Sequence, residues 1–378
     1  MCKELFWLPR KYYRHKVVDA LNVFSCHTRV FSGPDALGYL ETLPYHRALV
    51  VTDAFFAGNG TAEAVGGRIP DAEVRVYGDV RPDPDVETVA RGVAAMEAFS
   101  PDVLIALGGG SPMDCAKAMR YASGREVPLI AVPTTSGTGS EVTTFAIITS
   151  GQTKLALVDD ALAPDAAVLD ESLVRSLPPA LVADAGFDLL SHCAEAAAAT
   201  GASKASTALA CGAFSTAYRL LARSFRGETS VRGQIHEASC LAGIAFNSAG
   251  LGACHALSHA LGGRFHVAHG RLNAVLLPAV MARCAPACAG AYSDLARAAD
   301  VAGSTDTLRL RNLLSGLRRL RAQLCLPETL AQAGIDPAAL DGAMDDLCRA
   351  ALDDRCIRTS PVRFSSDDLA AILREVSA

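Results

Sequence analysis

The sequence predicts an α/β N-terminal domain built on a parallel, doubly wound sheet, followed by an all-α C-terminal domain. The first half of the 378-residue chain alternates short β-branched runs with helically spaced apolar residues. After Pro178 and Pro179, alanine and leucine dominate, strand-like runs disappear, and helical periodicity continues almost to the C-terminus. We therefore expect an extension over residues 1–21, an α/β domain over 22–182 and a helical domain over 183–378.

The elements of the first half follow one another in a regular order. Four runs bounded by Pro, Gly or Asp predict strands, namely RALVVTD (47–53), AEVRVYG (72–78), DVLIALGGG (102–110) and PLIAVPTT (128–135). Helical apolar spacing predicts helices over 84–99 and 111–122. Because strand, helix and strand repeat, the sheet should be parallel, with helices on its faces. The β-rich stretch 143–160 predicts a hairpin that turns at Gly151.

Composition excludes several classes of partner. The net charge of −5 argues against nucleic acid, because phosphate binding needs a basic surface. The sequence shows no uninterrupted apolar run near the roughly 20 residues that span a bilayer, so we expect no membrane. The basic, aromatic residues 1–20 have too short an apolar core for a signal peptide. The twelve cysteines are scattered singly, as expected of free, mostly buried thiols in a reducing cytoplasm.

Two glycine-rich loops at strand ends predict a dinucleotide site. In the first, Gly108, Gly109 and Gly110 let the backbone approach a pyrophosphate, with Ser111 expected as the helix N-cap, Pro112 as the first helical residue and Asp114 three positions after the cap. The second, 133–141, offers small hydroxyls to phosphate or ribose: Thr134, Thr135 and Ser140, with Thr143 just beyond. Either loop alone could be a tight turn, and the GxGxxG spacing is absent. Together, about 25 residues apart in one α/β domain, they favour cofactor binding.

Asp53 ends the first strong strand. A carboxylate there can accept hydrogen bonds from ribose hydroxyls and would repel a 2′-phosphate, which favours NAD over NADP. A turn-forming aspartate is the alternative.

Histidines gather in two short helical segments of a chain that holds only nine. Asp188 and His192 are one helical turn apart, and so are His255 and His259. His266 and His269 follow after two glycines. One carboxylate and several imidazoles from separate helices can converge on a divalent metal, although each pair alone could be a capping or core histidine. The donor types suit zinc and ferrous iron equally.

At this point four motifs resemble one known family, the iron-containing (group III) alcohol dehydrogenases. They are GGGSPMDCAKA, PTTSGTGSEVT, GFDLLSHCAEA and GLGACHALSHALGGRFHVAHGRLNAVLLP, and the resemblance runs from about residue 22 to the C-terminus. It implies a dinucleotide-binding domain facing an all-helical metal-binding domain. The implied metal ligands are Asp188, His192, His255 and His269. The implied catalytic residue is His259, near the nicotinamide and not a ligand, whereas His266 has no implied role.

Further implications come from the same resemblance. Lys154 matches a family lysine near the cofactor, and the implied cofactors are NAD(H) and Fe²⁺, with Zn²⁺ as the alternative. Within the family the chain is most similar to the 1-propanol dehydrogenases of propanediol-utilisation bacterial microcompartments. This similarity implies a cytoplasmic homo-oligomer, a dimer or larger, that reduces propionaldehyde or a similar short aldehyde, regenerates NAD and contacts microcompartment shell or cargo proteins. Residues 1–21 lie outside the resemblance, and we expect disorder or packing on a neighbouring subunit more than an encapsulation signal.

The sequence also departs from the family pattern. Ala185 to Leu189 stand where the family usually shows Thr-Gly-Met-Asp-Ala, which leaves the ligand Asp188 intact but changes the pocket around it. The loop around Gly151 is short. Two alternative functions therefore stay open: a zinc enzyme of the same fold, such as a glycerol dehydrogenase or a dehydroquinate synthase, and a catalytically silent subunit associated with a microcompartment.

Overall fold

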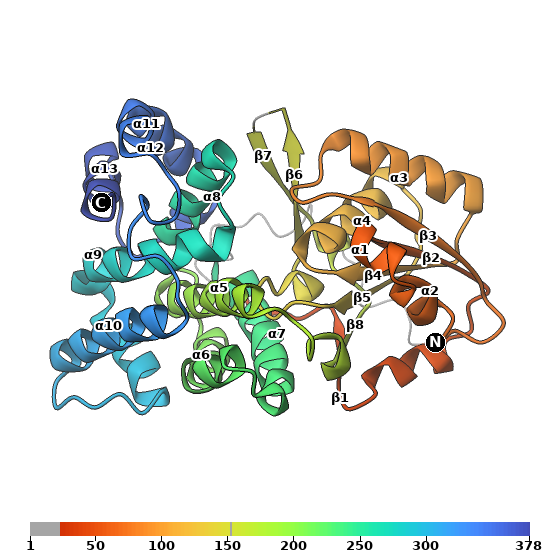
Figure 1. The fold of residues 1–378 in the computed structure, drawn as a ribbon, viewed down its shortest axis with the longest axis horizontal. Helices are drawn as coiled ribbons and strands as arrows, with labels where there is room; N and C mark the ends of the chain where they lie inside the picture. The colour runs from red at the N-terminus through yellow and green to blue at the C-terminus, as the bar shows by residue number, and fades with distance from the viewer. Residues whose placement is uncertain (1–22, 152) are drawn as a thin grey trace, which may run out of the picture.

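The computed structural model describes residues 23–151 and 153–378, and the predicted extension over 1–21 lies outside them. The chain forms a sheet domain and a helical domain that lie side by side (Figure 1). Six parallel strands make the sheet in the order β1-β8-β5-β4-β2-β3, with bounds β1 Arg29–Gly33, β2 Arg47–Asp53, β3 Glu73–Val80, β4 Val103–Gly108, β5 Leu129–Pro133 and β8 Ala166–Asp170. β6 (Phe145–Ser150) and β7 (Thr153–Val158) form a separate antiparallel hairpin, with Gly151 at φ 60° in its turn.

Alternate residues of the central strands pack against helices on opposite faces of the sheet. Leu49 and Leu104 belong to the apolar cluster under α3 (Val86–Phe99) and α4 (Gly110–Ser123). Val50 and Ile105 face the other way, into a cluster that includes α2 (Thr61–Gly66) and the short helix η3 (Ala36–Thr42). The short α1 (Ala54–Gly58) directly follows β2. Because both faces of a parallel sheet are covered, these strands are apolar throughout rather than alternating. The predicted α/β and all-α fold class is confirmed.

The helical domain packs around one large apolar core. Its helices are α5 (Pro179–Ala198), α6 (Lys204–Phe225), α7 (Arg232–Ala249), α8 (Ala253–Phe265), α9 (His269–Ala298), α10 (Asp306–Gln323), α11 (Pro337–Gly342), α12 (Met344–Asp353) and α13 (Ser366–Glu375). Pro178 precedes α5 and Pro179 opens it, where a missing N–H costs nothing. α9 is long and apolar enough to cross a membrane by length and composition, but half of its apolar window is buried in this core, where α5, α8 and α10 contact it.

Several sequence expectations are corrected in detail. Ser111 is not the N-cap of α4, because the helix begins at Gly110 and its cap is Gly109. Pro112 is accordingly the third helical residue and not the first. Two sheet strands, β1 and β8, were not predicted; each is only five residues long, and they pair with each other across more than 130 residues of sequence. The cysteines among the described residues are all free, although Cys26 and Cys325 are exposed.

The loops that follow the strands place the cofactor motifs along one sheet edge. Gly108 at the end of β4 pairs in register with Pro133 at the end of β5, and the Thr134 N–H donates to the Gly108 carbonyl over 2.9 Å. Carboxyl ends of parallel strands are where open α/β sheets bind ligands. Helix α7 of the helical domain contacts β8 of the sheet, and α8 contacts β7 of the hairpin. The helical domain therefore adjoins the sheet domain at these elements (Figure 1).

Candidate metal and cofactor site

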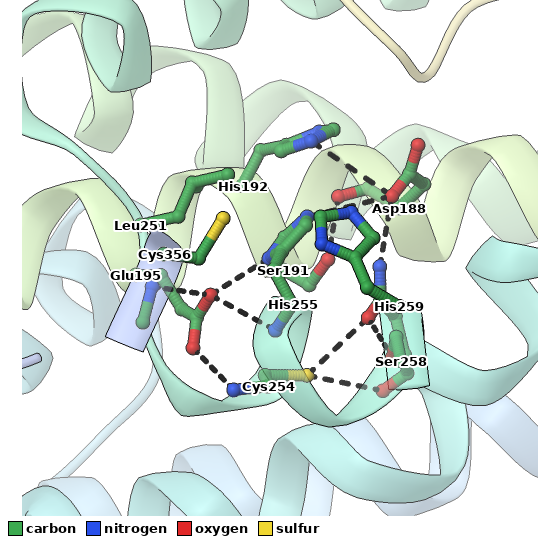
Figure 2. Close-up of polar contacts among 12 residues, drawn as sticks. Asp188, Ser191, His192, Glu195, Leu251, Cys254, His255, Ser258, His259 and Cys356 are labelled. Carbon is green, nitrogen blue, oxygen red and sulfur yellow. Dashed lines mark hydrogen bonds and ion pairs between the residues drawn. The ribbon is translucent and has the colours of Figure 1, made fainter. Parts of the chain in front are cut away.

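Four predicted ligands converge on one point between three helices. Asp188 and His192 lie one turn apart on α5, His255 lies on α8, and His269 is the first residue of α9. From Asp188 Oδ1 the distances to the three imidazole Nε2 atoms are 3.5 Å for His269, 3.7 Å for His255 and 3.9 Å for His192. Figure 2 shows Asp188 with His192 and His255 around it. Ligand atoms held about 2.1 Å from an ion in a tetrahedron lie about 3.4 Å apart. The ligand atoms of Asp188, His192 and His255 all lie within 4.8 Å of one another, as one ion requires, and His269 is near Asp188 but outside that triplet.

Two of these imidazoles are fixed by hydrogen bonds on their other ring nitrogen. His192 Nδ1 lies 3.1 Å from the Gly137 carbonyl oxygen, and His255 Nδ1 lies 2.7 Å from Glu195 Oε2. Both partners are acceptors, so Nδ1 carries the proton and Nε2 faces Asp188, which is the arrangement typical of metal-binding histidines. Glu195 is itself held because it accepts the N–H groups of Gly252 and Cys254 at the start of α8 (Figure 2).

One observation tests whether the donors fit a cation. His255 Nε2 is buried and has no hydrogen-bond partner among the described residues. An unpaired buried nitrogen is costly, and an ion bound there would remove that cost. The donor set of one carboxylate and three imidazoles suits Fe²⁺ or Zn²⁺.

The electrostatics of the pocket favour a cation. Burial opposes a charge on Asp188, but the imidazoles around it outweigh burial and hold the pKa of this carboxyl well below its usual range. Burial lowers the pKa of His192 to about 4. Burial also opposes a charge on His255, but the neighbouring carboxylates of Asp188 and Glu195 outweigh burial and raise its pKa to about 9. In the metal-free pocket the proton on His255 therefore takes the position that a metal ion would claim.

His259, the predicted catalytic residue, is adjacent to the ligands but bonded elsewhere. It lies one turn after His255 on α8, and its ring stacks on that of His269 with centroids 5.1 Å apart. His259 Nδ1 lies 2.8 Å from Asp354 Oδ2, which leaves Nε2 as its free ring nitrogen. Burial raises the pKa of Asp354, but the bond to His259 outweighs burial and lowers it to about 2. His266, the predicted bystander, is exposed at the left-handed end of α8.

The first glycine loop is shaped by close contacts. Gly108 has φ 143°, and a Cβ there would meet the Pro112 ring at 2.6 Å. A Cβ on Gly109 would approach the Thr135 side chain at 3.3 Å, and one on Gly110 the Thr138 side chain at 3.2 Å. The two predicted cofactor loops thus lie against each other, and a side chain at Gly109 or Gly110 would require Thr135 or Thr138 to shift by a few tenths of an ångström.

The remaining predicted cofactor residues of this region form an internal network. Asp114 accepts the Ser140 hydroxyl at 2.6 Å and the Ile147 N–H at 3.0 Å. Lys117, which the sequence reasoning missed, donates from Nζ to Ser140 Oγ at 3.1 Å and to Thr143 Oγ1 at 2.9 Å. Burial lowers the pKa of Lys117 to about 8. This network ties the second loop to α4, so Asp114, Ser140 and Thr143 hold the loop in place.

Three other predicted cofactor residues lie outside this network. Asp53 Oδ1 accepts the N–H groups of Phe55 and Phe56 and caps α1, so it ends β2 and makes the turn as well. Lys154 on β7 pairs with Asp83 at 2.7 Å. Ser111 Oγ accepts the Asp83 N–H at 3.3 Å rather than capping α4.

Known proteins resemble this chain over nearly its whole length. Residues 27–171 match the family described as iron-containing alcohol dehydrogenase, and residues 182–377 match the C-terminal domain of that family. The chain is 37% identical over 366 residues to the 1-propanol dehydrogenase PduQ of Citrobacter freundii, covering 93% of this chain and 99% of that protein. It is 34% identical over 373 residues to the NADPH-dependent butanol dehydrogenase of Clostridium saccharobutylicum, covering 92% and 96%. The solved structure of an iron-containing alcohol dehydrogenase from Thermococcus thioreducens has a TM-score of 0.87 at 29% identity, covering 94% of this chain and 99% of that one.

Proposed function

The chain belongs to the iron-containing alcohol dehydrogenase family, and on this premise we propose that it reduces short unbranched aldehydes such as propionaldehyde to primary alcohols with NADH. The observation that carries the proposal is the convergence of three Nε2 atoms on Asp188 Oδ1 within 3.9 Å, beside the two glycine-rich loops. The similarity to a 1-propanol dehydrogenase supports the three-carbon substrate.

The metal would be held by Asp188, His192, His255 and His269. When bound, a divalent ion here supplies Lewis acidity toward a substrate oxygen and so stabilises the negative charge that hydride transfer creates. The chain's own contribution is to fix the donors: the Gly137 carbonyl and Glu195 set the ring orientation of His192 and His255, and burial keeps water away from both.

His259 is the proposed proton donor to the product oxygen, directly or through a water that it positions. Asp354 accepts from its Nδ1, so Nε2 is the ring nitrogen that would carry the proton to be donated, and solvent would resupply that proton after each turnover. The side chain of His259 is about one fifth exposed, whereas that of His255 is only 1% exposed. His259 can therefore exchange protons with solvent.

The proposed cofactor is NAD(H). The backbone of the β4–α4 loop would lie close to a pyrophosphate, because the loop consists of Gly108, Gly109 and Gly110. Thr134 and Thr135 belong to the neighbouring loop. A negative charge at Asp53 supports NAD over NADP, because it would repel a 2′-phosphate. One relative is named as NADPH-dependent, so family membership alone does not decide between NADH and NADPH, and this part of the proposal rests on Asp53.

We also propose an oligomeric state and a cellular location for the enzyme. β1 is an edge strand of the sheet in the described part of the chain, with β8 on its one paired side, and such an edge supports association of two copies. The similarity to 1-propanol dehydrogenases supports a cytoplasmic location, inside a microcompartment for propanediol use.

The test is a rate comparison on anaerobically purified chain loaded with Fe²⁺. NADH oxidation with propionaldehyde, acetaldehyde and butyraldehyde is expected, together with about one equivalent of metal per chain by elemental analysis. Turnover of glycerol with Zn²⁺ and not of these aldehydes would instead identify an enzyme of the glycerol dehydrogenase kind. Metal binding without any turnover would identify a catalytically silent subunit.

A further inference from the structure

Asn273 is a buried amide in contact with two of the proposed ligands. It lies on α9 one turn after His269 and is fully buried. Its Nδ2 donates to Asp188 Oδ1 at 2.9 Å and lies 3.1 Å from His269 Nε2. Asparagine Nδ2 can only donate, so in this contact His269 Nε2 must be the acceptor and its lone pair must face the pocket.

The orientation of this amide is set from the opposite side. Asn273 Oδ1 accepts the hydroxyl of Ser258 and, at 3.5 Å, the thiol of Cys254. Both donors lie on α8, one turn apart, on the face next to the one that carries His255 and His259 (Figure 2). The contact with Asp188 decides the orientation, because the reversed amide would place Asn273 Oδ1 against the carboxylate oxygen, and neither atom can donate.

His269 is the ligand that most needs such a partner. The side chains of His192 and His255 are 6% and 1% exposed, but that of His269 is 33% exposed. His192 and His255 have acceptors at Nδ1, the Gly137 carbonyl and Glu195. No such acceptor for His269 Nδ1 is found within the described residues, and Asn273 acts on the other nitrogen of the ring.

We propose that Asn273 is a positioning residue of the metal site. Without metal it holds Asp188 Oδ1 and His269 Nε2 at ligand spacing and keeps His269 in the tautomer that can coordinate. When an ion takes the lone pair of His269, the amide keeps its hydrogen bond to the second lone pair of Asp188 Oδ1 and fixes the carboxylate. The amide thereby raises the affinity of the site for its ion. This inference rests on the ligand set of the proposed function.

The experiment measures metal binding by the full-length, metal-free chain, with Co²⁺ as an optical probe in competition with a chelator. Asn273→Leu keeps the side-chain volume and removes all four contacts, and we expect it to raise the Kd for Co²⁺ about 10- to 100-fold. Ser258→Ala keeps Asn273 but removes one of the two donors to its Oδ1. We expect a smaller rise in the Kd for Co²⁺, of a few fold. The matched control is Asn312→Leu, because Asn312 lies on α10 and its side-chain amide donates to the Ala302 carbonyl over 2.8 Å and not to any proposed ligand.

A second measurement reports the tautomer itself. Histidine-selective ¹⁵N spectra of the metal-free parent should show His269 protonated on Nδ1, and Asn273→Leu should show both tautomers. A merely structural asparagine would leave this signal unchanged. If Asn273→Leu does not fold, as judged by circular dichroism, Ser258→Ala carries the test.

The outcomes are separable. If the parent chain binds no Co²⁺, the proposed ligand set is wrong. If the parent binds Co²⁺, and Ser258→Ala and a folded Asn273→Leu bind it within twofold of the parent, Asn273 has no positioning role and the proposed function stands.

Discussion

Asp354 Oδ2 lies 2.8 Å from His259 Nδ1 and joins the segment after α12 to the proposed proton donor on α8. Its other oxygen accepts the Cys356 N–H at 2.7 Å, so the carboxylate is held from two sides. A carboxylate in this position fixes both the ring orientation and the tautomer of a histidine.

Asp354→Ala should therefore lower kcat for propionaldehyde reduction by roughly tenfold to a hundredfold. KM for the aldehyde and the iron content should change little, because the proposed ligands are untouched. Steady-state kinetics with metal analysis checks this. An unchanged kcat would show that His259 works without Asp354, and lost iron would show that the effect is structural.

Gly270→Ala should disturb the metal pocket from the backbone. A Cβ at this position would lie 2.0 Å from the Asp184 carbonyl oxygen on α5 and 3.2 Å from Asp188 Cβ. The two helices must separate, which we expect to cost about 1–3 kcal/mol of unfolding free energy and to weaken metal binding. Gly290→Ala is the control, because Gly290 lies beyond the kink of α9 at Cys288 and a Cβ there meets nothing within 4 Å. Equal unfolding midpoints in urea for the two variants would contradict the prediction.

Asp53→Ser should relax the choice of cofactor. Serine still caps α1 by accepting a backbone N–H, but it removes the charge that would oppose a 2′-phosphate. The ratio of kcat/KM for NADPH to that for NADH should rise by about tenfold or more, with little change in stability. Asp53→Ala also loses the cap, at a cost of about 1 kcal/mol. A ratio that stays constant in both variants would place the determinant elsewhere.

His236 should make the chain less stable in mild acid. Burial lowers its pKa to about 4, and its Nδ1 lies 3.0 Å from the Ser136 hydroxyl. Because the folded-state pKa lies below the ordinary value of about 6.5, the unfolded chain binds the proton first. The stability that His236 contributes is complete above pH 6.5 and is lost as the pH falls toward 4.

The measurement is the free energy of unfolding of the metal-free chain between pH 4 and 7. His236→Gln should reduce its slope by at most about 1.4 kcal/mol per pH unit. His46→Gln, at an exposed histidine, should leave the slope as it is. Parallel curves for the parent and His236→Gln would exclude this role.

Metal should stabilise the folded chain through the four proposed ligands. An ion that binds only the folded state adds about 2.7 kcal/mol when its free concentration is a hundred times Kd. The Tm of the metal-free parent should therefore rise with Co²⁺ or Fe²⁺, and that of His255→Ala should not. His266→Asn, at the exposed end of α8, should respond like the parent. A Tm that rises equally in His255→Ala would mean that the ion binds elsewhere.

Helical spacing is a local property, so the sequence predicted two pairs that share a helix face, whereas the ligand set itself, with His269, was implied by the family resemblance. Asp188 and His192, and likewise His255 and His259, are four residues apart, and a helix brings such pairs to one face. Their partners could not be predicted in the same way. Glu195 and Asp354 reach His255 and His259 across 60 and 95 residues, and no spacing in the sequence announces such contacts.

The error at Ser111 has a related cause. A serine before a proline is typical of a helix start, but the glycines before it allow α4 to begin at Gly110. The Ser111 hydroxyl then accepts from Asp83 instead, a contact across 28 residues.

Gly137 belongs to the second glycine-rich loop, and its carbonyl is also the acceptor that orients His192. There is no room for a side chain, since a Cβ would lie 2.7 Å from the Ala185 carbonyl oxygen. The loop proposed to bind the nucleotide therefore also orients a proposed ligand of the ion. If bound nucleotide changes the affinity of the site for iron, then iron must change the affinity for nucleotide by the same factor. A chain loaded with one of them would then bind the other with a Kd changed by that factor, whichever is added first.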